Sequence, residues 1–160
     1  VGDNSVLLEP VDVVAPCGWG GVLNADTIPR MQARIVCGAA NNQLLEEEDA
    51  QRLKDRGIIY VPDFVANRMG IVNCANEQYG RVGDLSALSD PSITRHFDNE
   101  WENSIRNIVR RVLDDAKARD LTTAASANQL AEEFAAQPHP IWGHRVRDIV
   151  KSLVDDGWAN

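Results

Sequence analysis

Three short apolar segments, separated by helical patterns, constrain the fold of this chain more than any other feature. The segments are Val11–Ala15, Ile35–Cys37 and Ile58–Val61. Each is rich in β-branched residues and ends at a proline or a run of small residues, which is typical of a strand followed by a turn. Strands that alternate with helices predict βαβ units with parallel strands and right-handed crossovers. Because the segments are short, mainly apolar runs rather than alternating ones, we expect helices to cover both faces of the sheet.

The two predicted helices between these strands have recognisable ends. The first is short, with Asn24 or Asp26 as its N-cap, and it closes at Arg30–Gln32. The second runs over Glu46–Arg56, and the acidic residues in its first turn interact favourably with the helix dipole. Gly57 then ends this helix, because glycine readily adopts the left-handed conformation that follows helices.

Strand patterns stop at Asn67, and the remaining residues predict helices. The predicted helices are Gly70–Tyr79, a long helix after Pro91, one opening at Thr122 or Thr123, and a last one over Trp142–Asp155, with a loop at 80–90 and a break at Pro138–Pro140. The long helix has a packed face at intervals of three or four residues: Ile93, Phe97, Trp101, Ile105, Ile108, Val112 and Ala116. The next helix has a similar face, formed by Ala127, Leu130, Ala131 and Phe134.

The order of these elements predicts a lopsided α/β protein. Its small parallel sheet is equivalent to the second half of a doubly wound, Rossmann-like sheet whose first half is absent. We therefore expect a partial Rossmann-like region over residues 1–79 and a helical C-terminal region over residues 80–160 that packs on it. Since a half-sheet is missing and the first residue is Val1, we also expect the chain to be part of a longer protein.

Charge and composition exclude several classes of function. The 160 residues are 44% hydrophobic and 25% charged, as in an ordinary soluble domain. No apolar run approaches the roughly 20 residues that span a bilayer, so no membrane role is expected. The net charge of −8 argues against nucleic acid as a partner, because such proteins need a basic surface. Three widely spaced cysteines imply no disulfide framework and favour a reducing cytoplasm.

Three local patterns invite a catalytic interpretation that the sequence supports poorly. The glycine-rich turn at Gly18–Leu23 departs from the dinucleotide fingerprint G-x-G-x-x-G, because Leu23 stands at the third glycine. His139 and His144 lack further ligands at zinc spacing, and capping or packing explains them better. Cys17 lies where a nucleophile would be placed, at a helix N-terminus, but it has no convincing histidine partner.

The ends of the three predicted strands are stronger candidates for a site. They carry Pro16–Gly18, Gly38–Asn41 and Pro62–Asn67. In a parallel sheet these ends lie side by side at one edge, where open α/β sheets bind their ligands. Small residues and amides there suit the planar end of a cofactor, and Gly70–Cys74 offers an apolar wall. The alternative is that these are three ordinary turns.

Four consecutive segments carry a specific resemblance to a known family. They are V-D-V-V-A-P-C-G-W-G-G-V-L-N, I-V-C-G-A-A-N-N-Q-L, R-G-I-I-Y-V-P-D-F-V-A-N and G-I-V-N-C-A-N-E. In this order and spacing they resemble the Glu/Leu/Phe/Val dehydrogenase family, and most of all its leucine and phenylalanine dehydrogenase branch. The resemblance is continuous from about Leu7 to Tyr79 and looser from Gly80 on, where residues 121–133 are similar to the family's C-terminal helical region.

The resemblance implies an enzyme that oxidatively deaminates an L-amino acid to a 2-oxo acid and passes hydride to NAD or NADP. Independently of the resemblance, the cysteines favour a cytoplasmic protein, and an exposed sheet edge and the face of the long helix predict self-association into a homo-oligomer. In the family, the substrate domain with its catalytic Lys and Asp precedes the part that this chain resembles, and so does the glycine fingerprint of the cofactor domain. The resemblance therefore assigns no catalytic residue to this chain and makes the N-terminal substrate domain a missing partner.

Residue by residue, the resemblance implies the nicotinamide end of a cofactor site. Pro16, Cys17 and Gly18 match the turn that flanks the nicotinamide ribose in the family. Ala40 and Asn41 match positions that meet the nicotinamide, and Asn41 also faces the bound amino acid.

Two further residues, Ile71 and Cys74, match positions that line the substrate side-chain pocket in the family. They are one helical turn apart, so both can face one cavity. The chain departs from the family beside them, since it has Asn67-Arg68-Met69-Gly70 where the family usually has N-A-G-G. This departure predicts a different backbone path or a pocket that is smaller or more polar than in the leucine enzymes, and it leaves the identity of the amino acid open.

Two hypotheses of function follow. The first is the cofactor-domain portion of an NAD(P)-dependent amino acid dehydrogenase, inactive without its missing half. The second is a truncated, non-catalytic module that binds a partner or assembles an oligomer.

Overall fold

The computed structural model describes residues 4–79, 91–138, 151 and 154–155. The chain groups into two compact units, Val1–Ala127 and Asn128–Asn160. The sheet and the site discussed below lie in the first unit. The predicted loop at 80–90 and nearly all of the predicted last helix fall outside the described residues. The predicted division at residues 79 and 80 stays a prediction.

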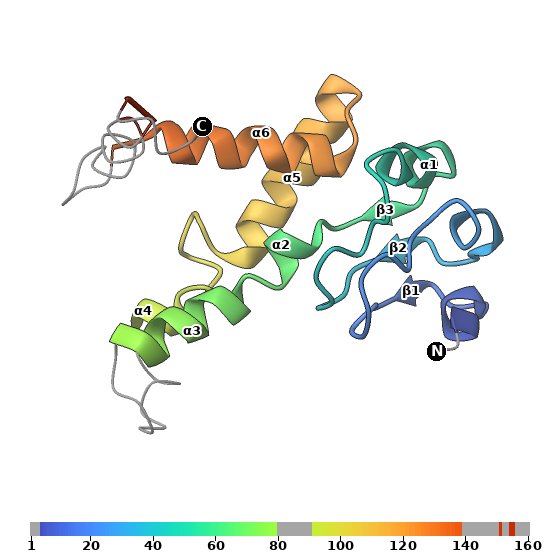
Figure 1. The fold of residues 1–160 in the computed structure, drawn as a ribbon, viewed down its shortest axis with the longest axis horizontal. Coiled ribbons are helices and arrows are strands. Elements are labelled where there is room, and N and C mark those ends of the chain that lie inside the picture. The colour runs from blue at the N-terminus through green and yellow to red at the C-terminus, as the bar shows by residue number, and fades with distance from the viewer. Residues whose placement is uncertain (1–3, 80–90, 139–150, 152–153, 156–160) are drawn as a thin grey trace. The chain divides into compact units, whose positions relative to one another are not determined.

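A three-stranded parallel sheet forms the centre of the first unit, as the sequence predicts (Figure 1). Its strands are β1 (Val13–Val14), β2 (Ile35–Val36) and β3 (Ile59–Tyr60), and they lie next to one another in chain order. The register pairs Val13 with Ile35 and Ile35 with Ile59. Each strand is shorter than the apolar segment that predicts it. The arrangement is that of half a doubly wound, Rossmann-like α/β sheet.

The expectation that helices cover both faces of the sheet is wrong for the described residues. Val14, Val36 and Tyr60 form one buried row across the sheet. The row on the opposite face is open, since Val13 is 51% and Ile59 is 46% exposed. Handedness explains the difference: right-handed crossovers between strands that advance in one direction lie on the same face.

The two crossovers contain the predicted helices in shortened form. The first holds a single 3₁₀ turn, η2 (Ile28–Arg30), with a proline near its start. The N-cap position of η2 is occupied by Thr27, without a side-chain capping hydrogen bond, so the prediction of Asn24 or Asp26 as the N-cap is wrong. Asn24 instead holds the preceding turn, since its Oδ1 accepts hydrogen bonds from the backbone nitrogens of Asp26 and Thr27, both at 3.0 Å. The second crossover holds α1 (Asp49–Asp55), which packs against β3 and η2.

Helix α1 begins three residues later than predicted because an aspartate caps the preceding turn. Oδ2 of Asp49 accepts a hydrogen bond from the backbone nitrogen of Glu46 at 2.9 Å. Oδ1 of the same side chain binds Arg52 at 2.6 Å, which compensates a carboxylate that is fully buried. Gly57 ends the helix with a φ of +68°, as predicted.

The hydrophobic core lies between the buried face of the sheet and these crossovers. Its fully buried centre consists of Leu23, Ile28, Met31, Val36 and Leu53. Leu7 and Ile58 complete the cluster at its edges. Burial of each such side chain contributes about 1.5–3 kcal/mol, so this cluster accounts for most of the local stability.

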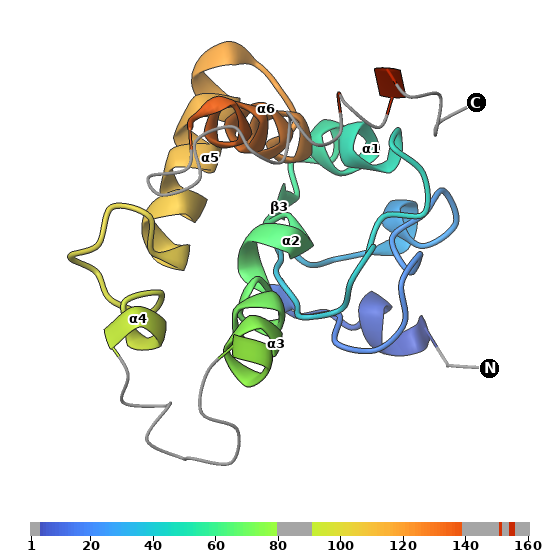
Figure 2. The same cartoon turned by 60° about the vertical axis from the view of Figure 1, so that its left-hand side comes forward.

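After β3 the chain is helical. The helices are α2 (Asp63–Ala66), α3 (Met69–Tyr79), α4 (Pro91–Thr94), α5 (Ile105–Arg119) and α6 (Thr123–Ala136). Helices α2 and α3 lead away from the sheet (Figure 2), and α2 contacts α5. Helix α3 confirms the predicted Gly70–Tyr79 helix to within one residue. No helix in the described ranges is long and apolar enough to cross a membrane.

The predicted long helix after Pro91 is wrong, because the chain turns between α4 and α5. Ser104 caps α5 by accepting a hydrogen bond from the backbone nitrogen of Asn107 at 3.3 Å. The side-chain amide of Asn107 donates to the backbone oxygens of Asn99 and Trp101, both at 2.9 Å, and folds the segment back. Phe97, predicted on the packed face, is 66% exposed.

The other predictions for helix α5 and helix α6 are confirmed in part. On α5, Ile108, Val112 and Ala116 are buried as the stripe predicts. Thr122 caps α6, as predicted, through a 3.1 Å hydrogen bond from the backbone nitrogen of Ala125. The predicted α6 face is half right: two members are buried and two are exposed, namely Ala127 and Leu130 against Ala131 and Phe134.

Candidate functional site at the strand ends

The turn after β2 packs directly on the end of β1. The backbone nitrogen of Ala40 donates to the backbone oxygen of Pro16 at 2.9 Å. Gly38 approaches so closely that a Cβ atom there would lie 2.1 Å from the same oxygen, so only glycine fits. Two strand ends of the predicted site therefore lie side by side, as a parallel sheet requires.

A buried amide supports this turn from inside. Gln43 is fully buried, and its Nε2 donates to the backbone oxygens of Gly38 and Ala40, both at 2.9 Å. Its Oε1 has no hydrogen-bond partner among the residues that the structure describes. Sequence reasoning missed Gln43. In the sequence, only its position directly after two asparagines distinguishes Gln43, because the burial of its side chain is visible only in the tertiary structure.

The third strand end meets the same turn through a carboxylate. Oδ2 of Asp63 accepts a hydrogen bond from the backbone nitrogen of Asn42 at 2.6 Å, and its Oδ1 accepts one from the Tyr60 hydroxyl at 3.1 Å. Burial, assisted by the negative charge of Asp63, raises the pKa of Tyr60 well above its usual value. The hydroxyl therefore stays protonated as a donor. Asn42 takes the left-handed conformation, with a φ of 52°.

The side chain of Asn41 is held from the end of α2. Nδ2 of Asn67 donates to Oδ1 of Asn41 at 2.5 Å and lies 3.3 Å from the backbone oxygen of Ala39. Asn41 is otherwise exposed at the edge of the sheet. The turn between Gly38 and Gln43 is thus bound from β1, from inside and from α2, and it presents two polar residues, Asn41 and Asn42, to solvent.

The glycine-rich turn after β1 packs against the turn after β2. The backbone nitrogen of Gly21 donates to the backbone oxygen of Asn42 at 2.7 Å. A Cβ atom on Gly20 would lie 2.8 Å from the backbone oxygen of Asn41, so this glycine permits close approach of the two turns. This agrees with the prediction of a tight turn at Gly18–Leu23.

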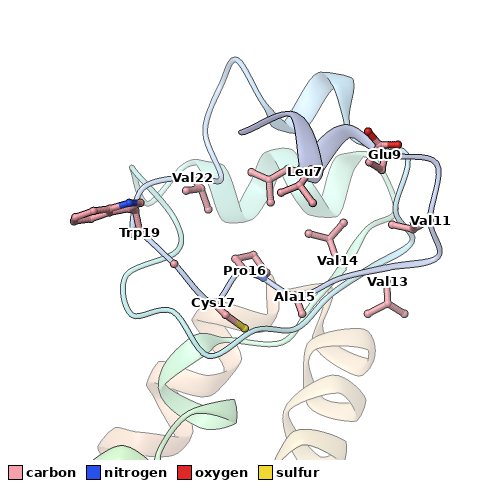
Figure 3. Close-up of a pocket in the computed structure, with 12 residues that line it drawn as sticks. Leu7, Glu9, Val11, Val13, Val14, Ala15, Pro16, Cys17, Trp19 and Val22 are labelled. Carbon is pink, nitrogen blue, oxygen red and sulfur yellow. The ribbon is translucent and has the colours of Figure 1, made fainter. Parts of the chain in front are cut away.

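An apolar cavity of about 390 Å³ lies along β1 and reaches this turn (Figure 3). Three of the predicted cofactor residues line it: Pro16, Cys17 and Gly18. Figure 3 shows Leu7 and Val14 beside Pro16, whereas the ring of Trp19 points away. Ala40 and Asn41 do not line this cavity.

The cysteines and histidines give no second chemistry in the described part of the chain. Burial, together with the nearby Cys17, raises the pKa of the Cys37 thiol, which disfavours its nucleophilic form. No group of three metal-ligating side chains occurs among the described residues. His139 and His144, the alternative metal ligands, lie outside them.

The two predicted substrate-pocket residues are open to solvent. Ile71 is 79% exposed on α3, and Cys74, one turn further along, is also exposed. A substrate pocket at these residues would require a cover over them. The described residues of this chain do not supply one.

The departure at Arg68 has a structural explanation. Its guanidinium donates to the backbone oxygen of Asn103 and lies 5.7 Å from the centre of the Trp101 ring. Arg95 covers the same ring at 4.5 Å. Arg68 is therefore engaged with the turn between α4 and α5, and burial lowers its pKa.

The sheet is half of a doubly wound α/β sheet, and its turns are joined at the carboxyl edge. This arrangement relates the chain to the class of nucleotide-binding α/β folds. Comparison with known proteins identifies the family. The sequence profile of the Glutamate/Leucine/Phenylalanine/Valine dehydrogenase family matches residues 1–138. The chain belongs to this family, as its sequence motifs predict.

The relatives are amino acid dehydrogenases. Valine dehydrogenase of Streptomyces coelicolor is 36% identical over 138 residues, which are 86% of this chain and 35% of the relative. Leucine dehydrogenase of Bacillus cereus is 32% identical over 133 residues, which are 83% of this chain and 33% of the relative. This chain therefore spans about a third of the length of these relatives.

Solved structures support the same fold. The crystal structure of L-tryptophan dehydrogenase from Nostoc punctiforme matches 78% of this chain and 35% of that chain, with a TM-score of 0.63 and 36% identity. A hetero-hexameric glutamate dehydrogenase from Thermus thermophilus matches 81% of this chain and 30% of that chain, with a TM-score of 0.58 and 23% identity. The second match shows the fold alone.

Proposed function

We propose that this chain forms the nicotinamide end of the cofactor site in an NAD(P)-dependent L-amino acid dehydrogenase. The reaction is the oxidative deamination of an amino acid to a 2-oxo acid. The observation that carries the proposal is the turn at residues 38–43, which is bound to all three strand ends and exposes Asn41 at the edge of the sheet.

The residues present fit a planar cofactor ring. Gly38 and Gly20 let the two turns pack without side chains between them. Beside them, the turn formed by Pro16, Cys17 and Gly18, which also lines an apolar cavity along β1, flanks the nicotinamide ribose in this proposal. When bound, the cofactor supplies the hydride acceptor, and the protein supplies orientation. Ala40 and Asn41 hold the amide end in this proposal.

The substrate side of the site is incomplete in this chain. We assign Ile71 and Cys74 to the wall that meets the substrate side chain, with Asn41 facing the bound amino acid. Their exposure supports a wall that a second domain covers. The catalytic acid–base groups and the cradle for the cofactor phosphates belong, in this proposal, to an N-terminal portion that the chain does not span. The assembled enzyme is a cytoplasmic homo-oligomer.

The test uses the protein expressed from its complete reading frame, with whatever coding sequence stands in frame upstream of Val1. NAD⁺ and NADP⁺ reduction is followed by absorbance with valine, leucine, phenylalanine, tryptophan and glutamate as substrates. Turnover of at least one amino acid with one cofactor supports the proposal. Absence of turnover with all ten combinations contradicts it.

A non-catalytic module is the second candidate, and one observation favours it. The open row on the sheet, with Val13 and Ile59 half exposed, is the kind of apolar surface that partners cover. A start codon directly before Val1, together with self-association of the 160-residue protein in sedimentation, would support this function. For the 160 residues alone we expect weak or no NADH binding, and micromolar affinity in a fluorescence titration would refute that expectation.

A further inference from the structure

Two asparagine side chains at the proposed site form a relay with a defined direction. Nδ2 of Asn67 is the donor, and Oδ1 of Asn41 is the acceptor, at 2.5 Å. The same Nδ2 also lies 3.3 Å from the backbone oxygen of Ala39. A backbone carbonyl only accepts hydrogen bonds, so it favours the amide orientation in which Asn67 points its NH₂ group toward Ala39.

The orientation of Asn67 decides that of Asn41. With the NH₂ group of Asn67 directed at it, Asn41 is most stable when it offers its oxygen. Its own NH₂ group is then turned away from α2, and no hydrogen bond holds it within the described residues. Asn41 therefore faces the site as a donor.

The backbones of both residues are restrained, so the relay is rigid. Asn67 follows the last residue of α2, and its backbone nitrogen donates to the backbone oxygen of Asp63 at 2.7 Å. On the other side, Asn41 is flanked by Ala40, bound to Pro16, and by Asn42, bound to Asp63. Because both backbones are restrained, only a rotation of the two side-chain amide groups can change this contact.

We propose that Asn67 is a positioning residue that fixes the amide of Asn41, so that Asn41 donates a hydrogen bond to a carbonyl or carboxylate oxygen of the bound cofactor or substrate. This inference rests on the proposed function and deepens it. It assigns a direction to the contact: the group recognised at Asn41 is a hydrogen-bond acceptor, and an ammonium group is disfavoured there.

The variant Asn67→Asp separates orientation from tethering. A carboxylate at position 67 cannot donate, so it loses the hydrogen bond to Ala39 and keeps a contact with Asn41 only if Asn41 reverses its amide and donates to it. The reversed Asn41 then presents its oxygen to the ligand. We expect kcat/KM to fall on the order of tenfold to a hundredfold. The variant Asn67→Ala removes the tether and leaves Asn41 free to rotate, so its loss is smaller. If Asn67 only tethers Asn41 and does not set the orientation of its amide, Asn67→Ala should lose more kcat/KM than Asn67→Asp.

Two controls address the added charge. Asn99→Asp makes the same chemical change at an exposed position and should leave kcat/KM unchanged. Raising the salt concentration to about 1 M shortens the screening length to roughly 3 Å, so a purely electrostatic effect of Asn67→Asp shrinks. The reversal of an amide does not depend on salt. Full recovery of Asn67→Asp at high salt would overturn the inference.

Nuclear magnetic resonance of side-chain amides tests the relay without turnover. In the wild-type protein the Asn67 NH₂ protons should exchange slowly and those of Asn41 rapidly, and Asn67→Asp should slow the exchange of the Asn41 protons. Unchanged Asn41 exchange would refute the relay. A wild-type protein that turns over no amino acid refutes the proposed function, and the amide exchange then decides the relay by itself. A turnover-competent enzyme in which Asn67→Asp is as active as Asn99→Asp refutes the inference alone.

Discussion

Gly38 and Pro16 approach each other so closely that no side chain fits between them. A Cβ atom at position 38 would lie 2.1 Å from the backbone oxygen of Pro16 and 2.4 Å from its nitrogen. Both contacts are with backbone atoms, so neither can be relieved by a change of rotamer. The packing of the turn after β2 on the end of β1 therefore depends on the absence of a Cβ atom at position 38.

Gly38→Ala should destabilise the protein by about 3 kcal/mol or more, because the turn must move away from β1. The matched control is Gly18→Ala in the neighbouring turn, where an added Cβ atom meets no other atom within 4 Å. Urea denaturation of both variants measures the difference. Equal stability of the two variants would show that the turn adapts to a side chain at position 38.

Gln43→Met should destabilise the protein by about 2–4 kcal/mol. Methionine fills a similar volume but leaves two buried backbone oxygens, those of Gly38 and Ala40, without donors. Gln51→Met on the exposed face of α1 is the control and should change the free energy of unfolding by a few tenths of a kcal/mol. Thermal or urea denaturation checks the comparison. A Gln43→Met protein as stable as the control would mean that water replaces the amide.

Tyr60 should make the protein less stable in alkaline solution. Its pKa is raised in the folded state, so the folded protein keeps the hydroxyl proton at a pH where the unfolded chain loses it. The stabilisation is complete below the unfolded pKa of about 10 and is lost progressively above it. Urea denaturation at pH 8 and pH 11 should show a larger loss for the wild type than for Tyr60→Phe. An equal loss for both proteins would assign the alkaline instability to other groups.

Arg68 and Arg95 both lie over Trp101, but they should differ in importance. Arg68 is half-buried and also donates to the backbone oxygen of Asn103, whereas Arg95 is exposed. We expect Arg68→Ala to destabilise the protein by about 1–3 kcal/mol and Arg95→Ala by about 0.5–1 kcal/mol. Denaturation measurements on the two variants test the order. The reverse order would place the larger interaction in the exposed stacking contact.

The sequence predicts the parallel sheet well because the apolar segments are separated by turn residues with specific chemistry. Gly57 ends its helix and Thr122 begins its helix through local contacts within a few residues, and such contacts can be read from a sequence. The same logic places the strand ends at one edge. It was wrong about the two covered faces, because apolar content does not reveal on which side the crossovers lie.

Long-range contacts explain the other differences. The apolar stripe after Pro91 favours one helix, but Arg68 holds the backbone at Asn103, 35 residues away in sequence. The spacing of apolar residues in the stripe carries no information about that contact. Gln43 is similar: its importance comes from full burial under a turn, and a polar residue after two asparagines predicts a surface loop. Ile71, which we propose for the substrate wall, is exposed, and the described residues do not cover it.

The open row of the sheet has a consequence for protein engineering. Val13, Ile35 and Ile59 stand in register on one face, so a free-standing version of this chain would need that face redesigned. Threonine at the two edge positions keeps the β-branched shape that strands favour and replaces apolar surface with hydroxyl groups. The same two substitutions in an assembled protein would weaken whatever packs there. At Val13 and Ile59, solubility of the free-standing chain thus favours threonine, whereas stability of an assembled protein favours the apolar side chains.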